Sequence, residues 1–229
     1  QDQIKNEILN VLKLVETTYG AFGLKYKFEL STRPEKKSTI GTDQDWEIAT
    51  KGLQDALESY GHPYEVNEGD GAFYGPKIDI MATDALGREW QLATEQLDFV
   101  QPERFSLEYI DEEGNRKRPV MIHKALLGSF ERFMAVYIEH TAGRFPVWVA
   151  PEQIRIASVN QEDSTLEFVE KLRESAVNLG LRITVDNDNE SVGKKIRNAE
   201  KDKVPYMLVV GQKEVESGEV TQESGLTCR

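Results

Sequence analysis

The segment MIHKALLGSFERFMAVYIEH, residues 121–140, predicts a strand end that runs into an apolar helix. The predicted helix carries Gly128, Ser129, Glu131 and Arg132, where a packed core helix would keep aliphatic side chains. Two small residues in succession, Gly128 and Ser129, let a bulky planar ligand approach the backbone. A guanidinium beside that ligand is a good phosphate binder. The alternative is an ordinary packed helix whose arginine forms a structural ion pair.

Two segments upstream predict a pair of strands: GDGAFYGPKIDI at residues 69–80 leads through three glycines and an aromatic pair into an alternating strand, and REWQLATEQLDF at 88–99 is the second strand. In the first strand, alternation places Lys77 and Asp79 on the face opposite Ile78. In the second strand, alternation separates Trp90, Leu92 and Thr94 on one face from Gln91, Ala93 and Glu95 on the other. The amides and the hydroxyl suit hydrogen bonding to a small polar ligand, and the alternative is an amphipathic hairpin with one wet face.

Three motifs in this order and spacing, FYGPKIDI, WQLATEQLDF and IHKALLGSFERF, resemble the C-terminal half of the catalytic domain of bacterial threonyl-tRNA synthetases. The segments STRPEKKSTIGTDQDWEIA at 31–49 and VPYMLVVGQKEVESG at 204–218 fit the same family. The resemblance covers nearly the whole chain and fades after about residue 218. The segment at 121–140 is similar to the third class II synthetase motif, whose arginine contacts ATP.

The resemblance implies roles for individual residues. Arg132 and Lys77 match catalytic positions, and Gln91, Thr94 and Arg132 match positions that contact ATP. Positions near the threonine substrate are matched by Tyr74, Gln96 and Ser129. His123 matches one of three ligands of a catalytic zinc ion. Leu92 and Ala93 replace the Cys and Gly of the commonest form of the family motif, which alters only pocket shape.

The chemistry fits these residue types. The carboxylate of threonine attacks the α-phosphate of ATP, which carries Mg2+, so the substrate is the nucleophile and the protein supplies positioning and charge neutralisation. An open zinc site can take the amine and hydroxyl of threonine, and a site built for that hydroxyl rejects valine. The other two zinc ligands of the family, a Cys and a His, precede the segment that this chain matches, as do the α-phosphate arginine motif and the dimer motif. The chain also starts at Gln1 rather than Met, so we expect a fragment that is inactive alone.

Composition indicates an ordinary globular protein. The chain has 229 residues, 39% hydrophobic content and no apolar run long enough to span a bilayer, so we expect a cytoplasmic protein without membrane or DNA partners. The single cysteine, Cys228, excludes an internal disulfide framework. The net charge of −12 does not favour RNA binding, which demands local positive charge. The one basic run comprises Lys194, Lys195, Arg197, Lys201 and Lys203, and its alternative interpretation is a solvated helix face.

Periodicity predicts an α/β fold in two domains. Residues 1–147 form the α+β catalytic part with an antiparallel sheet, in which helices at 3–19 and 45–60 flank a strand at 24–30. From 148 to 229, strands and helices alternate, which predicts an α/β domain with a mixed sheet. The family has its anticodon-binding domain here, and Asn189, Arg197 and Glu214 match positions that contact anticodon bases. The tail departs from the family, with Glu223 where an arginine is expected.

Three functions follow as hypotheses. The first is part of a threonyl-tRNA synthetase, with L-threonine, ATP and tRNA(Thr) as partners and a homodimer as the complete enzyme. The second is a non-catalytic tRNA-binding or regulatory protein derived from a synthetase. The third is a small-molecule binding module that uses the Tyr74–Gln96 hairpin without RNA. Lys77, Gln96 and Arg132 all keep the family residue, which favours the first hypothesis.

Overall fold

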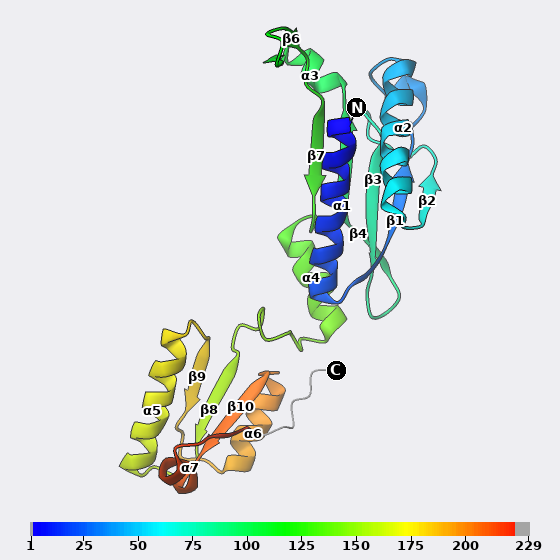
Figure 1. The fold of residues 1–229 in the computed structure, drawn as a ribbon. Helices are drawn as coiled ribbons and strands as arrows, with labels where there is room; N and C mark the ends of the chain where they lie inside the picture. Colours follow the sequence, from blue (N-terminus) through cyan, green and yellow to red (C-terminus); the bar gives the residue numbers. More distant parts are fainter. Residues whose placement is uncertain (1, 223–229) are drawn as a thin grey trace. The chain divides into compact units, whose positions relative to one another are not determined.

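The computed structural model describes residues 2–222, and Glu223 and Cys228 lie outside them. The chain divides into two compact units, one up to His140 and one from Thr141 (Figure 1). Each unit has its own sheet and its own buried residues. The α/β fold class predicted from the sequence is confirmed.

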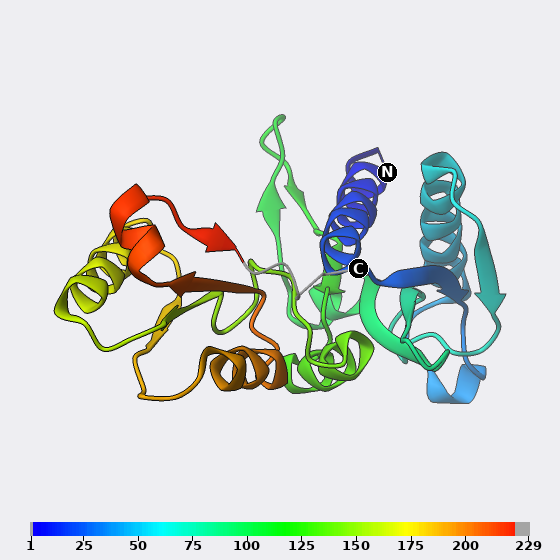
Figure 2. The same ribbon diagram turned by 90° about the horizontal axis from the view of Figure 1, so that it is seen from below.

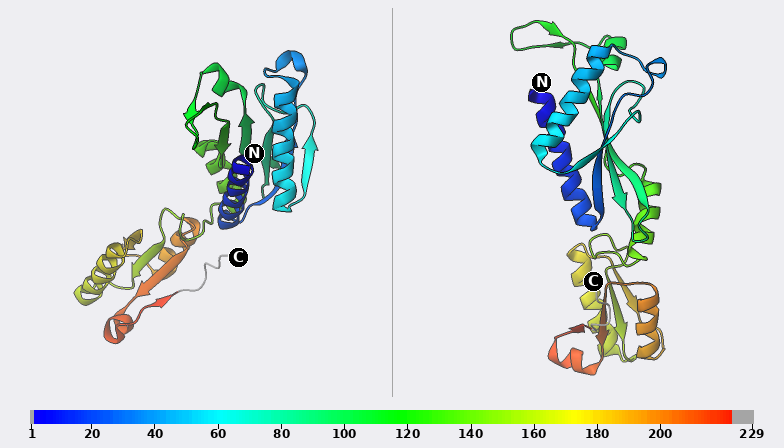
Figure 3. Two further views of the ribbon diagram at one scale, coloured as in Figure 1. Left: turned by 45° about the horizontal axis from the view of Figure 1, so that its top comes forward. Right: turned by 90° about the vertical axis from the view of Figure 1, so that its right-hand side faces the viewer.

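Two long helices cover one face of the sheet in the first unit (Figure 3). In α1 (Asp2–Phe22), Ile8, Leu12, Val15 and Tyr19 recur at helical spacing and are fully buried. Helix α2 (Asp43–Tyr60) begins at a capping box, in which Thr42 and Asp45 satisfy each other's backbone N–H groups. Both helices were predicted from their periodicity, and the structure extends α1 by three residues beyond the expected end.

The sheet of the first unit has five strands in the order β2-β1-β3-β4-β7. Their bounds are β1 (Lys25–Ser31), β2 (Tyr64–Asn67), β3 (Lys77–Thr83), β4 (Glu89–Asp98) and β7 (Met121–Ala125). All neighbours pair antiparallel except β1 and β2, which are parallel. The predicted strand pair is confirmed as β3 and β4, and β7 continues the polar face beside them.

Short elements complete the first unit. They are the 3-10 helix η1 (Lys36–Ser38), helix α3 (Val100–Arg104) and strands β5 (Tyr109–Ile110) and β6 (Arg116–Lys117). The β5–β6 hairpin extends away from the five-stranded sheet (Figures 1 and 2). Helix α4 (Phe130–Thr141) follows β7 and buries Phe133, Val136 and Tyr137.

The second unit is a three-layer α/β arrangement. Strands β8 (Ile154–Ser158), β9 (Ile183–Asp186) and β10 (Tyr206–Val210) are parallel, and β11 (Thr221–Gln222) pairs antiparallel with β10. Helix α5 (Asp163–Asn178) packs on β8 and β9, and α6 (Val192–Lys201) packs on β8 and β10 from the opposite face (Figure 3). A short helix, α7 (Gln212–Ser217), follows β10. Within residues 2–222, no helix is long and apolar enough to cross a membrane.

Candidate functional site

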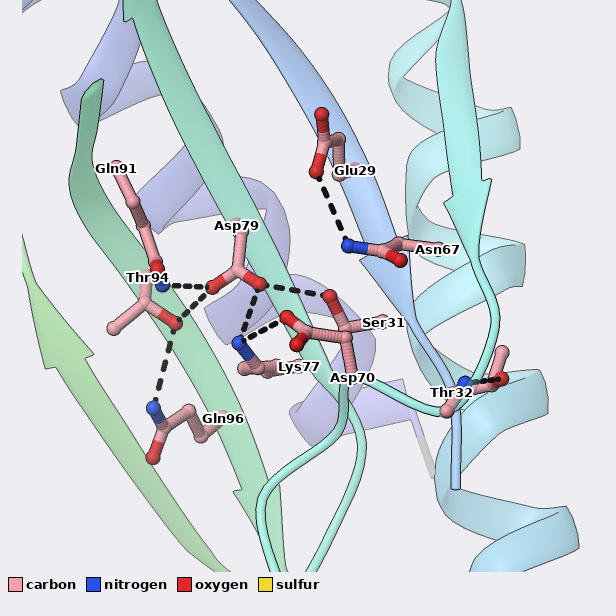
Figure 4. Close-up of polar contacts among 11 residues, drawn as sticks. Glu29, Ser31, Thr32, Asn67, Asp70, Lys77, Asp79, Gln91, Thr94 and Gln96 are labelled. Carbon is pink, nitrogen blue, oxygen red and sulfur yellow. Dashed lines mark hydrogen bonds and ion pairs between the residues drawn. The ribbon is translucent and has the colours of Figure 1, made fainter. Parts of the chain in front are cut away.

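A buried carboxylate organises the polar face of β3 and β4. Asp79, 2% exposed, accepts hydrogen bonds from Ser31 Oγ at 2.7 Å, Gln91 Nε2 at 2.5 Å and Thr94 Oγ1 at 2.9 Å, and it pairs with Lys77 Nζ at 2.7 Å (Figure 4). A buried carboxylate requires partners of this kind, because an unpaired charge there would be costly. The network therefore fixes the positions of Lys77, Gln91 and Thr94, three of the residues predicted to bind ATP or catalyse.

Lys77 is held as a cation. Besides Asp79, it pairs with Asp70 at 3.0 Å in the loop before β3. Burial alone lowers the pKa of Lys77, but the hydrogen bonds to Asp79 and Asp70 outweigh burial and the net pKa is raised. The ammonium therefore stays charged at neutral pH, as a group that neutralises phosphate must.

A β-bulge in β4 corrects the predicted facing of its side chains. Asp79 pairs with Thr94 and Ile80 with Ala93, but Met81 pairs with Gln91, so Leu92 is an extra residue in β4. Strict alternation put Gln91 and Thr94 on opposite faces, and that prediction was wrong. The bulge turns both side chains to the same carboxylate, as Figure 4 shows.

A second group of side chains lies where β4 pairs with β7. The Tyr74 hydroxyl donates to Gln96 Oε1, and Gln96 Nε2 lies 3.4 Å from Thr94 Oγ1, which links this group to the Asp79 network. Gln96 is the cross-strand partner of His123, whose ring lies 5.3 Å from that of Tyr74. Burial raises the pKa of Tyr74, and the nearby charge of Asp98 raises it further, so its hydroxyl keeps its proton.

Gly75 fixes the loop that carries Tyr74. A Cβ at this position would lie 2.0 Å from the carbonyl oxygen of Leu97, a separation that no side chain can adopt. Leu97 N also donates to the carbonyl of Pro76 at 3.2 Å. The glycine therefore lets the loop lie directly against β4 and bring Tyr74 to Gln96.

Ser129 and Arg132 flank the start of α4. Gly128 has φ +66° and Ser129 precedes the helix, so the prediction that both lie inside the helix was wrong. Ser129 Oγ accepts the backbone N–H of Arg132 at 3.1 Å, which is an N-terminal cap. The Arg132 side chain is exposed, and its guanidinium forms no hydrogen bond or ion pair with any described residue. In particular, it does not pair with Asp79, so the structural ion pair considered as the alternative is not formed there. The guanidinium is free to bind an anion.

His123 fits a single position in a metal site. Its side chain is 34% exposed and its Nε2 lies 3.0 Å from a buried carboxylate oxygen of Asp98, an arrangement common among metal-binding histidines. Zinc needs at least three protein ligands, and residues 2–222 contain no group of three His, Cys, Asp or Glu side chains placed to hold a metal ion. The described part of the chain therefore does not form a three-ligand zinc site by itself.

In the second unit, two of the three predicted anticodon residues follow the carboxyl ends of parallel strands. Asn189 lies in the loop after β9, Glu214 lies in α7 after β10, and Arg197 is an exposed residue of α6. One carboxylate oxygen of Glu214 accepts the N–H of Gly211 at 2.9 Å, so only part of this group is available. Ligands bind beyond the carboxyl ends of strands in open α/β sheets, which makes this edge the natural location of a site.

The basic run of the second unit is not uniformly exposed. Lys195 is 1% exposed, and its Nζ donates to the carbonyls of Ser158 at 2.9 Å and Asp186 at 3.0 Å. Lys194 is paired with Glu190. Lys195 therefore ties α6 to the ends of β8 and β9, so both interpretations of the basic run, a phosphate contact and a solvated helix face, are wrong for this residue.

Comparison with known families accounts for both units. Residues 1–141 match the tRNA synthetase class II core domain (G, H, P, S and T), and residues 153–224 match an anticodon binding domain. The chain belongs to the class II tRNA synthetase family. The threonyl-tRNA synthetase resemblance is supported by a threonine–tRNA ligase from Oleidesulfovibrio alaskensis, 53% identical over 216 residues, which cover 94% of this chain and 33% of that protein.

Other relatives agree. A threonine–tRNA ligase from Clostridium botulinum is 50% identical over 98% of this chain and 35% of its own length. The RNA binding domain of threonyl-tRNA synthetase from Cryptosporidium parvum superposes with a TM-score of 0.90 at 39% identity, over 97% of this chain and 55% of that chain. This chain thus spans about a third of the length of the curated relatives that it matches.

Sequence reasoning missed the carboxylates that hold this class II site together. Three aspartates were not among the candidate site residues. Asp79 contacts Lys77 and both ATP candidates on β4, Asp70 contacts Lys77, and Asp98 contacts His123. The available signal was an aspartate between two isoleucines in KIDI, because a charged residue between buried neighbours in a strand needs a partner. Asp98 carries a similar signal in QLDF.

Proposed function

We propose that this chain supplies part of the threonine and ATP pocket, and the anticodon-binding unit, of a threonyl-tRNA synthetase. The complete enzyme would activate L-threonine with ATP and transfer it to tRNA(Thr). The observation that carries the proposal is the open polar face of β3, β4 and β7, where one buried carboxylate holds Lys77, Gln91 and Thr94 in place.

The proposed roles are those that the family resemblance implies, and the contacts on this face support them. Gln91 and Thr94 bind the nucleotide, and the Lys77 ammonium and the Arg132 guanidinium neutralise charge on the phosphates of ATP–Mg2+. Tyr74 and Gln96 lie at the β7 side of this face and bind threonine, with Ser129 at the start of α4. Binding energy that increases as charge develops on the α-phosphate accelerates activation.

His123 would be one ligand of a zinc ion that the complete enzyme holds, and zinc would supply an open coordination position for threonine. In the second unit, Asn189, Arg197 and Glu214 would read unstacked anticodon bases by hydrogen bonding. In this proposal, residues 148–229 are the anticodon-binding domain. The complete enzyme is a homodimer and is located in the cytoplasm.

The alternative is a non-catalytic tRNA-binding or regulatory protein. Its supporting observation is that residues 2–222 provide one zinc-ligand candidate and no three-ligand group. The two proposals differ in whether the polar face activates threonine when the rest of a synthetase is present.

The test is a hybrid enzyme in which this chain replaces the matching 216 residues of the Oleidesulfovibrio alaskensis relative. We expect threonine-dependent ATP–pyrophosphate exchange from the hybrid and none from the 229-residue chain alone. His123→Ala in the hybrid should remove bound zinc and exchange together, with zinc measured by elemental analysis.

A folded hybrid that binds tRNA(Thr) but does not exchange would favour the non-catalytic alternative. Robust exchange by the isolated chain, or stoichiometric zinc bound to it, would show that the assigned ligand set is wrong.

A further inference from the structure

Asp98 is a buried acid whose carboxylate contacts the His123 ring. Its side chain is fully buried at the end of β4. One carboxylate oxygen, Oδ1, accepts the backbone N–H groups of Val100 and Gln101, each at 2.9 Å. The other oxygen, Oδ2, lies 3.0 Å from His123 Nε2 on the neighbouring strand β7. Both oxygens of Asp98 are therefore occupied, and their roles differ.

The chemistry of this contact decides where the imidazole proton sits. An ionised carboxylate can only accept hydrogen bonds, so the nitrogen that faces it must carry the proton. We propose that Asp98 is a positioning residue that fixes His123 as its Nε2–H tautomer and leaves the lone pair on Nδ1. Among the described residues, Asp98 is the only hydrogen-bond partner of the His123 ring.

The ring is also held from its side. The Tyr74 ring lies 5.3 Å from the imidazole at an interplanar angle of 55°, and the Tyr74 hydroxyl is bonded to Gln96, the cross-strand neighbour of His123. Two contacts from different elements, the loop before β3 and the end of β4, thus fix the orientation of the imidazole. When one ring nitrogen of a histidine donates a hydrogen bond to a carboxylate, the other ring nitrogen is available as a ligand for a metal or a substrate.

The tautomer rests on this contact alone, whereas its use in binding zinc rests on the proposed function. In the complete enzyme, Nδ1 of His123 would be the atom that faces the zinc ion or the substrate. The Asp98 carboxylate would not contact either one.

Asp98→Asn is the discriminating variant. Its Oδ1 can still accept the two backbone N–H groups, which keeps the turn after β4 and directs the amide NH2 at His123. An NH2 group is a donor, so Nε2 must then accept and the proton must move to Nδ1. The expected result is a reversal of the tautomer in a folded protein.

The experiment is a long-range ¹H–¹⁵N NMR correlation on the 229-residue chain labelled with ¹⁵N-histidine, at about pH 8, where imidazole is mostly neutral. His123→Gln assigns the His123 signals, since the only other histidines are His62 and His140. We expect protonated Nε2 in the wild type and protonated Nδ1 in Asp98→Asn.

Asp111→Asn is the matched control. Oδ1 of Asp111 also accepts two backbone N–H groups, from Glu113 at 3.0 Å and Asn115 at 2.8 Å, but it lies in the β5–β6 hairpin. The control should leave the His123 spectrum unchanged. Protonated Nδ1 in the wild type, or an unchanged tautomer in Asp98→Asn with a native-like amide spectrum, would overturn the proposal. Neither result depends on exchange by the hybrid, which tests the proposed function separately.

Discussion

On the open face of the first sheet, Asp79 and Asp98 accept several hydrogen bonds each, whereas Glu95, on the face toward the helices, accepts none. Glu95 is fully buried, and it lies opposite the equally buried Ile78 in the strand pairing. Burial raises the pKa of Glu95 to about 8, while the charge of Lys124 lowers it and that of Glu7 raises it.

The difference separates two uses of a buried acid. The aspartates stabilise charge and fix the directions of Lys77, Gln91 and His123, as a binding site requires. Glu95 orients nothing and is tolerated because it can take up a proton. Burial alone therefore does not identify a functional acid in this chain. The hydrogen-bond donors that surround the carboxylate do.

Removing the central acid of the open face should have the largest effect on stability. Asp79→Ala removes the acceptor of the Gln91 amide and of the hydroxyls of Ser31 and Thr94, and it leaves Lys77 with the more exposed Asp70 as its remaining ion pair. We expect a loss of about 3–5 kcal/mol in the free energy of unfolding, measured by urea denaturation of the first unit.

Asp70→Ala is the control, because Asp70 pairs with the same lysine from a side chain that is 56% exposed. It should cost less than about 1 kcal/mol. Equal costs for the two variants would contradict the assignment of Asp79 as the centre of the network.

Glu95→Gln should have the next largest effect, and its sign depends on pH. The folded-state pKa of about 8 lies above the ordinary glutamate value, so the folded chain keeps a proton that the unfolded chain has released. Wild-type stability should fall as pH rises from about 4.5 to about 8, by up to roughly 1.4 kcal/mol per pH unit. The variant cannot ionise at this position, so it should lose this dependence and be the more stable protein above about pH 8.

Unfolding free energies at about pH 5 and about pH 9 test this expectation, because both proteins hold a neutral group at the lower pH. Glu112→Gln in the exposed β5–β6 turn should change neither value. Parallel pH profiles for Glu95→Gln and wild type would mean that Glu95 has a partner.

Ser129→Ala should have the smallest effect, about 1 kcal/mol, because it removes the cap at the start of α4. Ser191 starts α6 without a side-chain cap hydrogen bond, so Ser191→Ala should cost much less. Thermal melting of the two units reports both changes. A larger loss for Ser191→Ala would refute the capping role of Ser129.

Most elements could be predicted because their signals are local. The spacing of Ile8, Leu12 and Val15 defined α1, and an aspartate near the start of the second apolar stretch located α2 within two residues. Strand β2 was not predicted, because four residues are too few to show the alternation of apolar and polar side chains, and its parallel pairing with β1 is not visible in the sequence. Alternation also fails at Leu92, since an inserted residue in one strand is visible only against its partner.

The candidate site was predictable as a set of residues but not as a network. Motif resemblance named Lys77, Gln91, Thr94 and Arg132, whereas the acid that joins the first three lies on another strand from two of them. Lys195 shows the opposite error, because a lysine in a basic run reads as exposed until its carbonyl partners are located. Contacts between distant segments decide both cases.

We propose that the open face of the first unit binds threonine and ATP within a complete threonyl-tRNA synthetase. The most direct test is the threonine-dependent exchange rate of Arg132→Lys in the hybrid enzyme, expressed per folded molecule. Lysine keeps the charge but loses the planar fork of the guanidinium, so we expect a fall of about ten-fold or more, or ~1.4 kcal/mol per decade, with an unchanged melting temperature. An unchanged exchange rate with a melting temperature lower by several degrees would make Arg132 a structural residue and contradict the account.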